Sequence, residues 1–67
     1  MIKKQVGNRI KELRNRLDIS QEELGFRSGV HRTYIASLEV GKRNVSVVTL
    51  EKIVKALEVS MSDFFNF

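Results

Sequence analysis

The sequence predicts an all-α fold, a compact domain of five short helices, and three observations lead to this prediction. The chain has 67 residues, the size of one small domain, so we expect residues 1–67 to fold as a single unit. It contains no proline and four glycines, while 42% of its residues are hydrophobic. This composition is typical of helices joined by short turns. The hydrophobic residues also recur at the period of an α-helix.

The first two helices are indicated by hydrophobic spacing and by a capping motif. A stripe at i, i+4, i+7 and i+11 predicts a helix over about residues 3–17. A second helix is expected over about residues 21–28, because Ser20 and Glu23 form the S-x-x-E pattern of a capping box. In that motif the Ser20 hydroxyl accepts from the Glu23 amide while the Glu23 side chain reaches back, and Gly29 then ends the helix. The stripe of the first helix consists of Val6, Ile10, Leu13 and Leu17.

Three further helices are predicted by the same kinds of pattern. The third helix should close at Gly41, where glycine suits a left-handed cap, and the polar loop of residues 42–44 follows. Ser46 can cap a fourth helix, and Ser60 with Asp63 repeats the capping box before a last apolar turn. The hydrophobic positions of these helices are Tyr34, Ile35 and Leu38 in the third, Leu50, Ile53, Val54 and Leu57 in the fourth, and Phe64 and Phe65 in the fifth.

The net charge of +4 is distributed unevenly along the chain. Residues 1–16 carry +5 and residues 27–43 carry +3, whereas residues 17–26 carry −3 and residues 44–67 carry −1. A basic footprint of this kind suits a polyanion such as DNA, because each phosphate that is neutralised releases condensed counterions. A solvated basic face is the alternative interpretation.

Several classes of function are disfavoured by the composition. Without cysteine there is no disulfide or zinc thiolate, and a single histidine cannot assemble a metal site, so we expect no metal and no cofactor. No apolar window is long enough to span a membrane, and the N-terminus lacks the apolar run of a signal peptide, so a cytoplasmic location is expected. No catalytic motif is present, and so short a chain can hardly shape a pocket, which argues against an enzyme and against a small-molecule ligand.

Residues 21–40 meet the requirements of a helix-turn-helix. Two helices that cross a tight turn need a small residue inside the first, a glycine at the turn and apolar residues at the joint. An ordinary helical hairpin is the alternative, but the matching positions are in register and the second helix lies in the basic segment of residues 27–43. The six matching positions are Leu24, Gly25, Gly29, Val30, Ile35 and Leu38.

These residues resemble the phage-repressor and Cro-like (Xre) helix-turn-helix family, whose fold is lambda-repressor-like. The resemblance is carried by residues 20–24, 28–35 and 38–44, and it covers nearly the whole chain. The runs Arg32-Thr33-Tyr34-Ile35 and Arg43-Asn44-Val45-Ser46 are most similar to controller proteins of restriction-modification systems. The resemblance implies a sequence-specific transcriptional regulator. It would bind double-stranded DNA as a homodimer on a palindromic operator, with one recognition helix in the major groove of each half-site.

The resemblance also assigns roles to individual residues. Base contacts fall at the start of the third helix, on Arg32, Thr33 and Ser37. Arg32 can pair bidentately with guanine, and Thr33 offers a hydroxyl or a methyl group. A solvated arginine, or one that contacts only phosphate, is the alternative for Arg32. DNA phosphate contacts fall on Gln21, Arg14, Tyr34, Lys42, Arg43 and Asn44.

Two of these positions, Arg14 and Tyr34, have a second interpretation, and the role of the nearby His31 is open. Arg14 is expected first to form a structural pair with Glu39 and only secondarily to approach a phosphate. Tyr34 can pack at the margin of the motif instead of touching DNA. His31 stands at the usual N-cap position although histidine caps less well than serine, threonine or asparagine. A contact to the DNA backbone and an exposed bystander are both open for His31.

Two further surfaces are predicted to bind proteins. Val47, Val48, Phe64, Phe65 and Phe67 exceed what so short a chain needs to bury, which suggests a dimer interface. Completion of the monomer core by these aromatics is the alternative. Glu22 and Glu23 match a region that contacts RNA polymerase in activating relatives, although acids at a helix N-terminus are also favoured by the helix dipole.

A protein-docking module, such as an antitoxin, is the rival function, because fold alone does not determine function. The sequence shows no additional toxin-binding segment, which disfavours this class. A gel-shift experiment with a salt titration separates the two classes.

Overall fold

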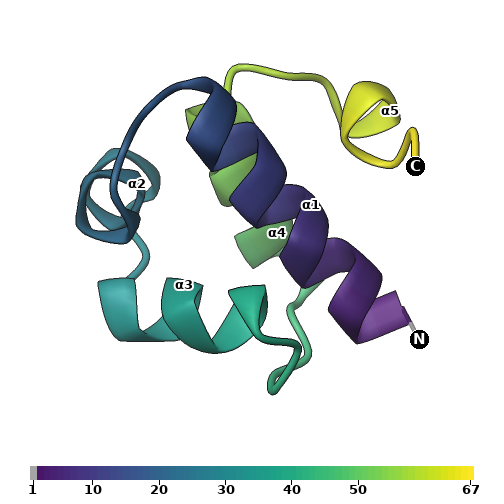
Figure 1. The fold of residues 1–67 in the computed structure, drawn as a ribbon, viewed down its shortest axis with the longest axis horizontal. Coiled ribbons are helices and arrows are strands. Elements are labelled where there is room, and N and C mark those ends of the chain that lie inside the picture. The colour runs from purple at the N-terminus through teal and green to yellow at the C-terminus, as the bar shows by residue number, and fades with distance from the viewer. Residues whose placement is uncertain (1) are drawn as a thin grey trace.

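The computed structural model describes residues 2–67, and in this range the chain forms five α-helices and no strand (Figure 1), as the sequence predicts. The first helix is the longest and the fifth is a single turn. None of the helices in this range is long and hydrophobic enough to cross a membrane. The helices are α1 (Ile2–Arg16), α2 (Gln21–Ser28), α3 (Arg32–Glu39), α4 (Val47–Ala56) and α5 (Met61–Phe64).

The helix ends lie close to where the local sequence predicts them. The hydroxyls of Ser20, Ser46 and Ser60 each accept a hydrogen bond from the backbone amide three residues later. Gly29 and Gly41 adopt left-handed backbone conformations, with φ of 74° and 75°. These single-residue features therefore determine where α2 and α4 begin and how α2 and α3 end.

One detail of the predicted capping box is wrong. The Glu23 side chain does not reach back to Ser20. It binds Arg27 one turn later on α2, with 2.8 Å between Arg27 Nε and Glu23 Oε2. A charged guanidinium at i+4 is a stronger partner for a carboxylate than a neutral backbone amide, so only the serine half of the motif is formed.

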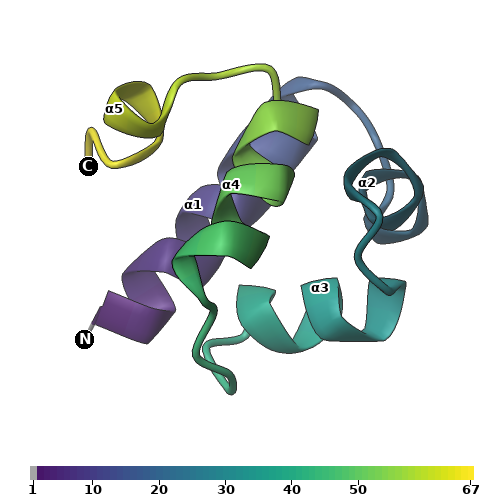
Figure 2. The same ribbon diagram turned by 180° about the vertical axis from the view of Figure 1, so that it is seen from behind.

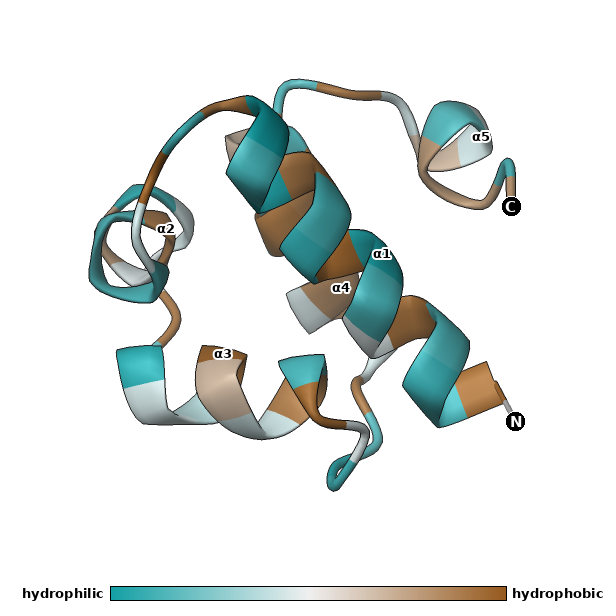
Figure 3. Ribbon diagram, viewed as in Figure 1, coloured by the Kyte–Doolittle hydropathy of each residue, from teal (hydrophilic) through white to brown (hydrophobic). Residues whose placement is uncertain are grey.

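The core is shared among all five helices. Helix α1 packs against α3, α2 packs against α3 and α4, and α5 packs against α4. Hydrophobic residues recur as bands along α1 (Figure 3), and those of its inner side belong to the core. The buried hydrophobic side chains are Val6, Ile10, Leu13, Leu24, Ile35, Leu38, Leu50, Ile53, Val54, Leu57 and Phe64.

The prediction that Phe64 lies in an exposed dimer surface is wrong, because its side chain is 0% exposed within one chain. A one-turn helix presents only one inward position to the core, and in α5 that position is Phe64. The alternative interpretation, that an aromatic of this segment completes the monomer core, holds for this residue. Phe65 and Phe67 remain 43% and 55% exposed.

Helix α1 organises the fold through two residues that the sequence analysis did not single out. A Cβ atom on Gly7 would overlap the carbonyl oxygen of Leu38, so glycine permits the close crossing of α1 and α3. Arg9 is buried and donates to the carbonyl oxygens of Phe64 and Asp63, at 2.8 and 2.7 Å. These bonds fasten the C-terminal turn to α1 although it is distant in sequence.

Helices α2 and α3 lie at the opposite side of the molecule from α5, as both views show (Figures 1 and 2). Helix α3 and the loop that follows it form one face, while α5 and the C-terminal residues lie at the other. The fold therefore separates the helix-turn-helix from the aromatic C-terminal segment.

Candidate nucleic-acid interface

The turn between α2 and α3 is built on two glycines with different roles. A Cβ atom on Gly25 would lie 2.6 Å from the Val30 carbonyl oxygen, so the turn can approach α2 only at this small residue. Gly29 has open space around it, but its left-handed φ of 74° is disfavoured for other residues. The Val30 amide then donates to the Gly25 carbonyl oxygen at 3.1 Å. Both glycines thus serve the joint that the sequence predicts.

The start of α3 is open to solvent on one side. Arg32 and Thr33 are exposed, and Ser37 one turn later is half-buried. The Ser37 hydroxyl donates to the Tyr34 carbonyl oxygen at 2.8 Å, which leaves its oxygen as an acceptor. The predicted base-contacting residues therefore lie on one accessible strip of α3.

Arg32 has a partner that was not predicted from the sequence. Its Nη1 atom lies 2.9 Å from Oε2 of Glu22 on α2, and both side chains are largely exposed. An exposed ion pair of this kind contributes little to stability. The guanidinium is thus directed by Glu22 but can be released to a better partner at small cost.

His31 is the N-cap of α3, so the structure gives it a defined role. Its Nδ1 atom accepts a hydrogen bond from the Thr33 amide at 3.1 Å. The same nitrogen lies 2.8 Å from the Thr33 hydroxyl oxygen. His31 consequently holds the amide and the hydroxyl of Thr33, one of the predicted base-reading residues.

Glu39 at the end of α3 joins three parts of the motif. Arg14 donates two hydrogen bonds of 2.7 and 3.0 Å to its carboxylate, and Gln21 donates a third hydrogen bond of 3.1 Å. Arg14 also donates to the Ile19 carbonyl oxygen at 2.8 Å. Glu39 is buried, so the carboxylate needs these donors. The structure confirms the expectation of an Arg14–Glu39 pair, and it places Gln21 in the same cluster.

The bonding of Arg14 has an electrostatic consequence. Hydrogen bonds to Glu39 raise the pKa of Arg14 and outweigh the lowering caused by burial. The guanidinium therefore stays charged, and three of its nitrogens are already engaged within the chain. This arrangement favours a structural role for Arg14, with any phosphate contact secondary.

The loop after α3 is held by Tyr34. The phenol donates to the Asn44 carbonyl oxygen at 3.1 Å, and the Arg43 guanidinium lies 5.1 Å from the centre of the Tyr34 ring. Lys42, Arg43 and Asn44 are all exposed. Tyr34 thus fastens the loop to α3, and the packing role that the sequence left open for it is the one the contacts favour.

These elements define a class of protein: a tight helix-turn-helix whose second helix exposes Arg32 and leads into an exposed loop with Lys42 and Arg43 is the architecture of a major-groove DNA-binding regulator. Residues 10–64 match the family model described as helix-turn-helix, and the chain belongs to this family of DNA-binding regulators, which are not enzymes. The predictions of fold and of family are thereby confirmed.

Control proteins are among the relatives of this chain. The chain is 46% identical over 66 residues to the control protein C.MunI from Mycoplasma, a match that covers 97% of this chain and 89% of that protein. The crystal structure of the restriction-modification controller protein C.AhdI from Aeromonas hydrophila superposes with a TM-score of 0.90 at 40% identity, covering 94% of this chain and 91% of that one.

A third relative has been solved with its DNA. The restriction-modification controller protein C.Esp1396I, as a tetramer in complex with its natural 35 base-pair operator, matches with a TM-score of 0.92 at 38% identity. The match covers 97% of this chain and 86% of that one. Similarity in sequence and in fold thus leads to the same group of regulators.

Proposed function

We propose that this chain is a dimeric, operator-binding transcriptional regulator that controls a restriction-modification system. The observation that supports it most is the exposed strip of α3, which presents Arg32 and Thr33 on a helix anchored by a glycine turn and by Glu39. The operator complex of a relative with nearly the same fold agrees with it. Such a protein works where genomic DNA lies, so we place it in the cytoplasm.

In this proposal, one set of residues contacts the DNA bases and another contacts the phosphate backbone. Arg32, Thr33 and Ser37 would meet base edges in the major groove, with Arg32 forming a bidentate pair with guanine. The exposed loop after α3 would hold the backbone through Lys42, Arg43 and Asn44, because phosphate contacts fix register without carrying sequence information. Gln21 and Arg14 lie behind this surface and would support it, Gln21 through a phosphate at the N-terminus of α2.

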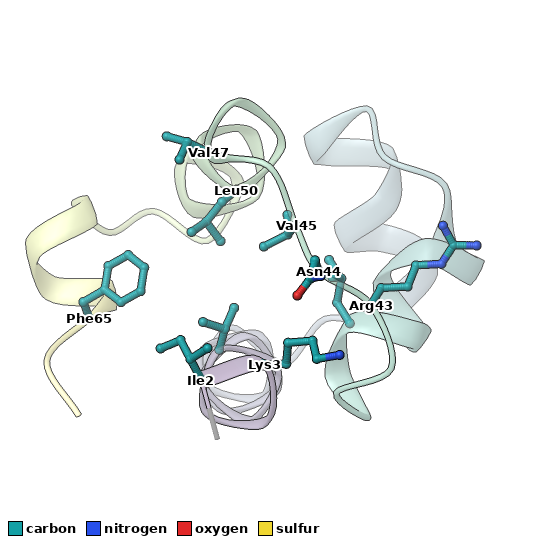
Figure 4. Close-up of a pocket in the computed structure, with 10 residues that line it drawn as sticks. Ile2, Lys3, Arg43, Asn44, Val45, Val47, Leu50 and Phe65 are labelled. Atoms are coloured by element: carbon teal, nitrogen blue, oxygen red, sulfur yellow. The ribbon is translucent and has the colours of Figure 1, made fainter.

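The dimer interface would form around an apolar hollow of about 230 Å³. Ile2 of α1, Leu50 of α4 and Phe65 after α5 converge on it (Figure 4), and Val47 lies at its rim. Ile2, Val47 and Val48 are 60%, 75% and 66% exposed, although they are hydrophobic. A self-complementary patch of this kind suits a two-fold dimer. Phe67 extends it at the C-terminus, 6.0 Å from the Phe65 ring.

An activating contact with RNA polymerase is a further part of the proposal. Glu22 and Glu23 remain on the surface of α2, although each is paired with an arginine. Phe26 on the same helix is 84% exposed and adds an apolar group beside these acids. Such a mixed surface fits a protein partner better than it fits DNA.

The test of DNA binding is its salt dependence. Log affinity for operator DNA, measured by fluorescence anisotropy, should fall linearly with log salt concentration, with a slope of about −0.9 per phosphate contacted. DNA selected from a random pool supplies the operator. A flat salt response, or no selected sequence, would contradict the proposal and favour a protein-docking role for the same fold.

A further inference from the structure

The contact between His31 and Thr33 has a direction that can be deduced from its chemistry. A backbone N–H can only donate, so His31 Nδ1, which accepts from the Thr33 amide at 3.1 Å, carries no proton. The Thr33 hydroxyl lies 2.8 Å from the same nitrogen and must therefore donate to it as well. The neutral ring then carries its proton on Nε2, and the two donors share the lone pair of Nδ1.

This arrangement determines what Thr33 can offer to DNA. Its hydroxyl proton is occupied within the chain, so the exposed oxygen presents only lone pairs to the groove. Such an oxygen accepts from the amino groups of adenine or cytosine, whereas it cannot donate to N7 of a purine, O6 of guanine or O4 of thymine. The base that Thr33 can bind therefore depends on His31, the partner of its hydroxyl.

We propose that His31 is a positioning residue that sets the hydrogen-bond polarity of Thr33, and that protonation of the ring reverses it. The inference rests on the proposed function, in which Thr33 reads a base. A proton on Nδ1 turns this atom into a donor, so it can no longer accept from the Thr33 amide and the helix loses its cap. The Nδ1–H group then donates to the Thr33 hydroxyl oxygen. The hydroxyl proton is then free to donate to an acceptor on a base.

Imidazole is the side chain that changes charge between pH 5 and 8. The other titratable or charged groups around His31 are Glu22 of α2, Arg32 and Tyr34 of α3, and Lys52 of α4, which line the two hollows beside the ring. A change in base preference with pH that the wild type shows and His31→Asn lacks is therefore assigned to the ring.

The test is selection of DNA from a random duplex pool at pH 8 and at pH 5.5 with the full chain. At pH 8 the wild type should prefer, at the Thr33 position, a base that donates an amino group. At pH 5.5 its preference should move toward an acceptor by about fivefold, the ratio that one hydrogen bond of typical net strength supplies. His31→Asn should keep the pH 8 preference at both pH values, because the asparagine oxygen caps the helix and never gains a proton. Thr33→Val, which lacks the hydroxyl, should show no change with pH.

A measurement without DNA checks the same contact. Nitrogen NMR of the labelled chain should show the proton of the neutral ring on Nε2, and the Thr33 amide signal should move with the ring as the pH falls. A proton on Nδ1 of the neutral ring would overturn the inference. So would an unchanged wild-type preference at pH 5.5, or an equal change in His31→Asn. If no variant selects any sequence at either pH, the proposed function fails and the inference fails with it.

Discussion

Arg32 and Arg43 lie near opposite ends of the surface proposed to face DNA, but their guanidinium groups have different partners. Arg32 pairs with Glu22 on the preceding helix, and Arg43 stacks over the Tyr34 ring in the loop after α3. The first is carried on a rigid helix, where a side chain can be aimed at a base edge. The second is carried on an exposed loop, where it can follow the backbone. The two arginines should therefore differ in what they contribute to binding.

Arg32→Ala should cost about 1 to 3 kcal/mol on the preferred operator and relax the choice of base at one position per half-site. Its affinity for unrelated DNA should change far less. Arg43→Ala should weaken binding to all sequences by a similar factor and reduce the salt slope by about one unit per lost contact. Fluorescence anisotropy with the selected operator and a scrambled duplex measures both effects.

Glu22→Gln is the matched control for Arg32. It removes the partner of the guanidinium but leaves the guanidinium in place, so affinity should change by less than about 1 kcal/mol. Equal losses for Arg32→Ala and Arg43→Ala on every DNA would show that Arg32 is another phosphate anchor. Base selection would then rest on Thr33, Ser37 or the shape of the DNA.

At the scale of the helices, two glycines show how spacing and backbone conformation are controlled separately. Gly7 lies where α1 crosses α3, and a Cβ atom there would meet backbone that cannot move aside easily. Gly29 ends α2 with a positive φ, but nothing lies within 4 Å of where its Cβ would be. One glycine is required for packing and the other for a turn.

Gly7→Ala should therefore destabilise the protein more than Gly29→Ala. The first forces α1 away from α3 and should cost about 3 kcal/mol, the upper part of the range for overpacking. The second strains one left-handed residue and should cost about 1 to 2 kcal/mol. Urea unfolding followed by circular dichroism gives both values. A smaller loss for Gly7→Ala would mean that α1 and α3 can separate without cost.

The attachment of α5 predicts a dependence on pH. Arg9, which holds the carbonyl oxygens of α5, also binds Glu12 at 2.9 Å, and chiefly this hydrogen bond lowers the pKa of Glu12 below its ordinary value of 4.5. A lowered pKa contributes stability above the unfolded value, and the contribution is lost as the pH falls through the folded value. The Tm of wild type should exceed that of Glu12→Gln above pH 5, and the difference should shrink below pH 4.5.

The control for this experiment is Glu51→Gln on α4. Glu51 is exposed and belongs to none of the ion pairs found among residues 2–67, so its replacement should leave the pH profile of the Tm unchanged. A difference between wild type and Glu12→Gln that stays constant down to pH 3 would contradict the role assigned to the carboxylate.

The helices were predictable from sequence because their ends depend on local chemistry. Ser20 and Gly29 cap the two ends of α2 through contacts with residues nearby in the chain. The features that were missed depend on segments brought together by folding. Gly7 meets α3, Arg9 meets α5, and Phe64 is buried only because a single turn is folded back onto the core. No pattern along the sequence specifies such meetings.

In the candidate site, too, some features could be predicted from the sequence and others depend on how the chain folds. The exposed strip at Arg32 and Thr33 could be predicted from the position of α3 in the motif. The family resemblance assigns base contacts to these two residues. The Arg14–Glu39 pair was also expected from the family pattern. The partners Glu22 for Arg32 and His31 for Thr33 were not, because each depends on side-chain geometry at the turn.

For the whole molecule, its dimensions explain why the proposed binding to two half-sites needs two copies. The described chain measures 26 × 22 × 21 Å, whereas successive major grooves on one side of DNA are roughly 34 Å apart. Two recognition helices at this spacing require two chains. The apolar hollow lined by Ile2, Leu50 and Phe65 is also bordered by Arg43 and Asn44 of the loop after α3, so the proposed dimer contact lies next to the loop that would hold DNA.

Val47→Glu should break the dimer without unfolding the monomer. Val47 is 75% exposed at the first position of α4, where an acid is favoured by the helix dipole, but the charge would be buried between two copies. Sedimentation at micromolar concentration should give a dimer for wild type and a monomer for Val47→Glu. Affinity for a full palindrome should fall to that for a single half-site, which should itself be unchanged.

Phe26→Ser is the control for loss of an exposed apolar group, because Phe26 lies on α2 and not among the residues that line the hollow. This variant should sediment as a dimer, like the wild type. A wild type that stays monomeric with and without operator DNA would contradict the dimer itself. A Val47→Glu variant that still dimerises would move the interface elsewhere, because a carboxylate cannot be buried without a partner at that position.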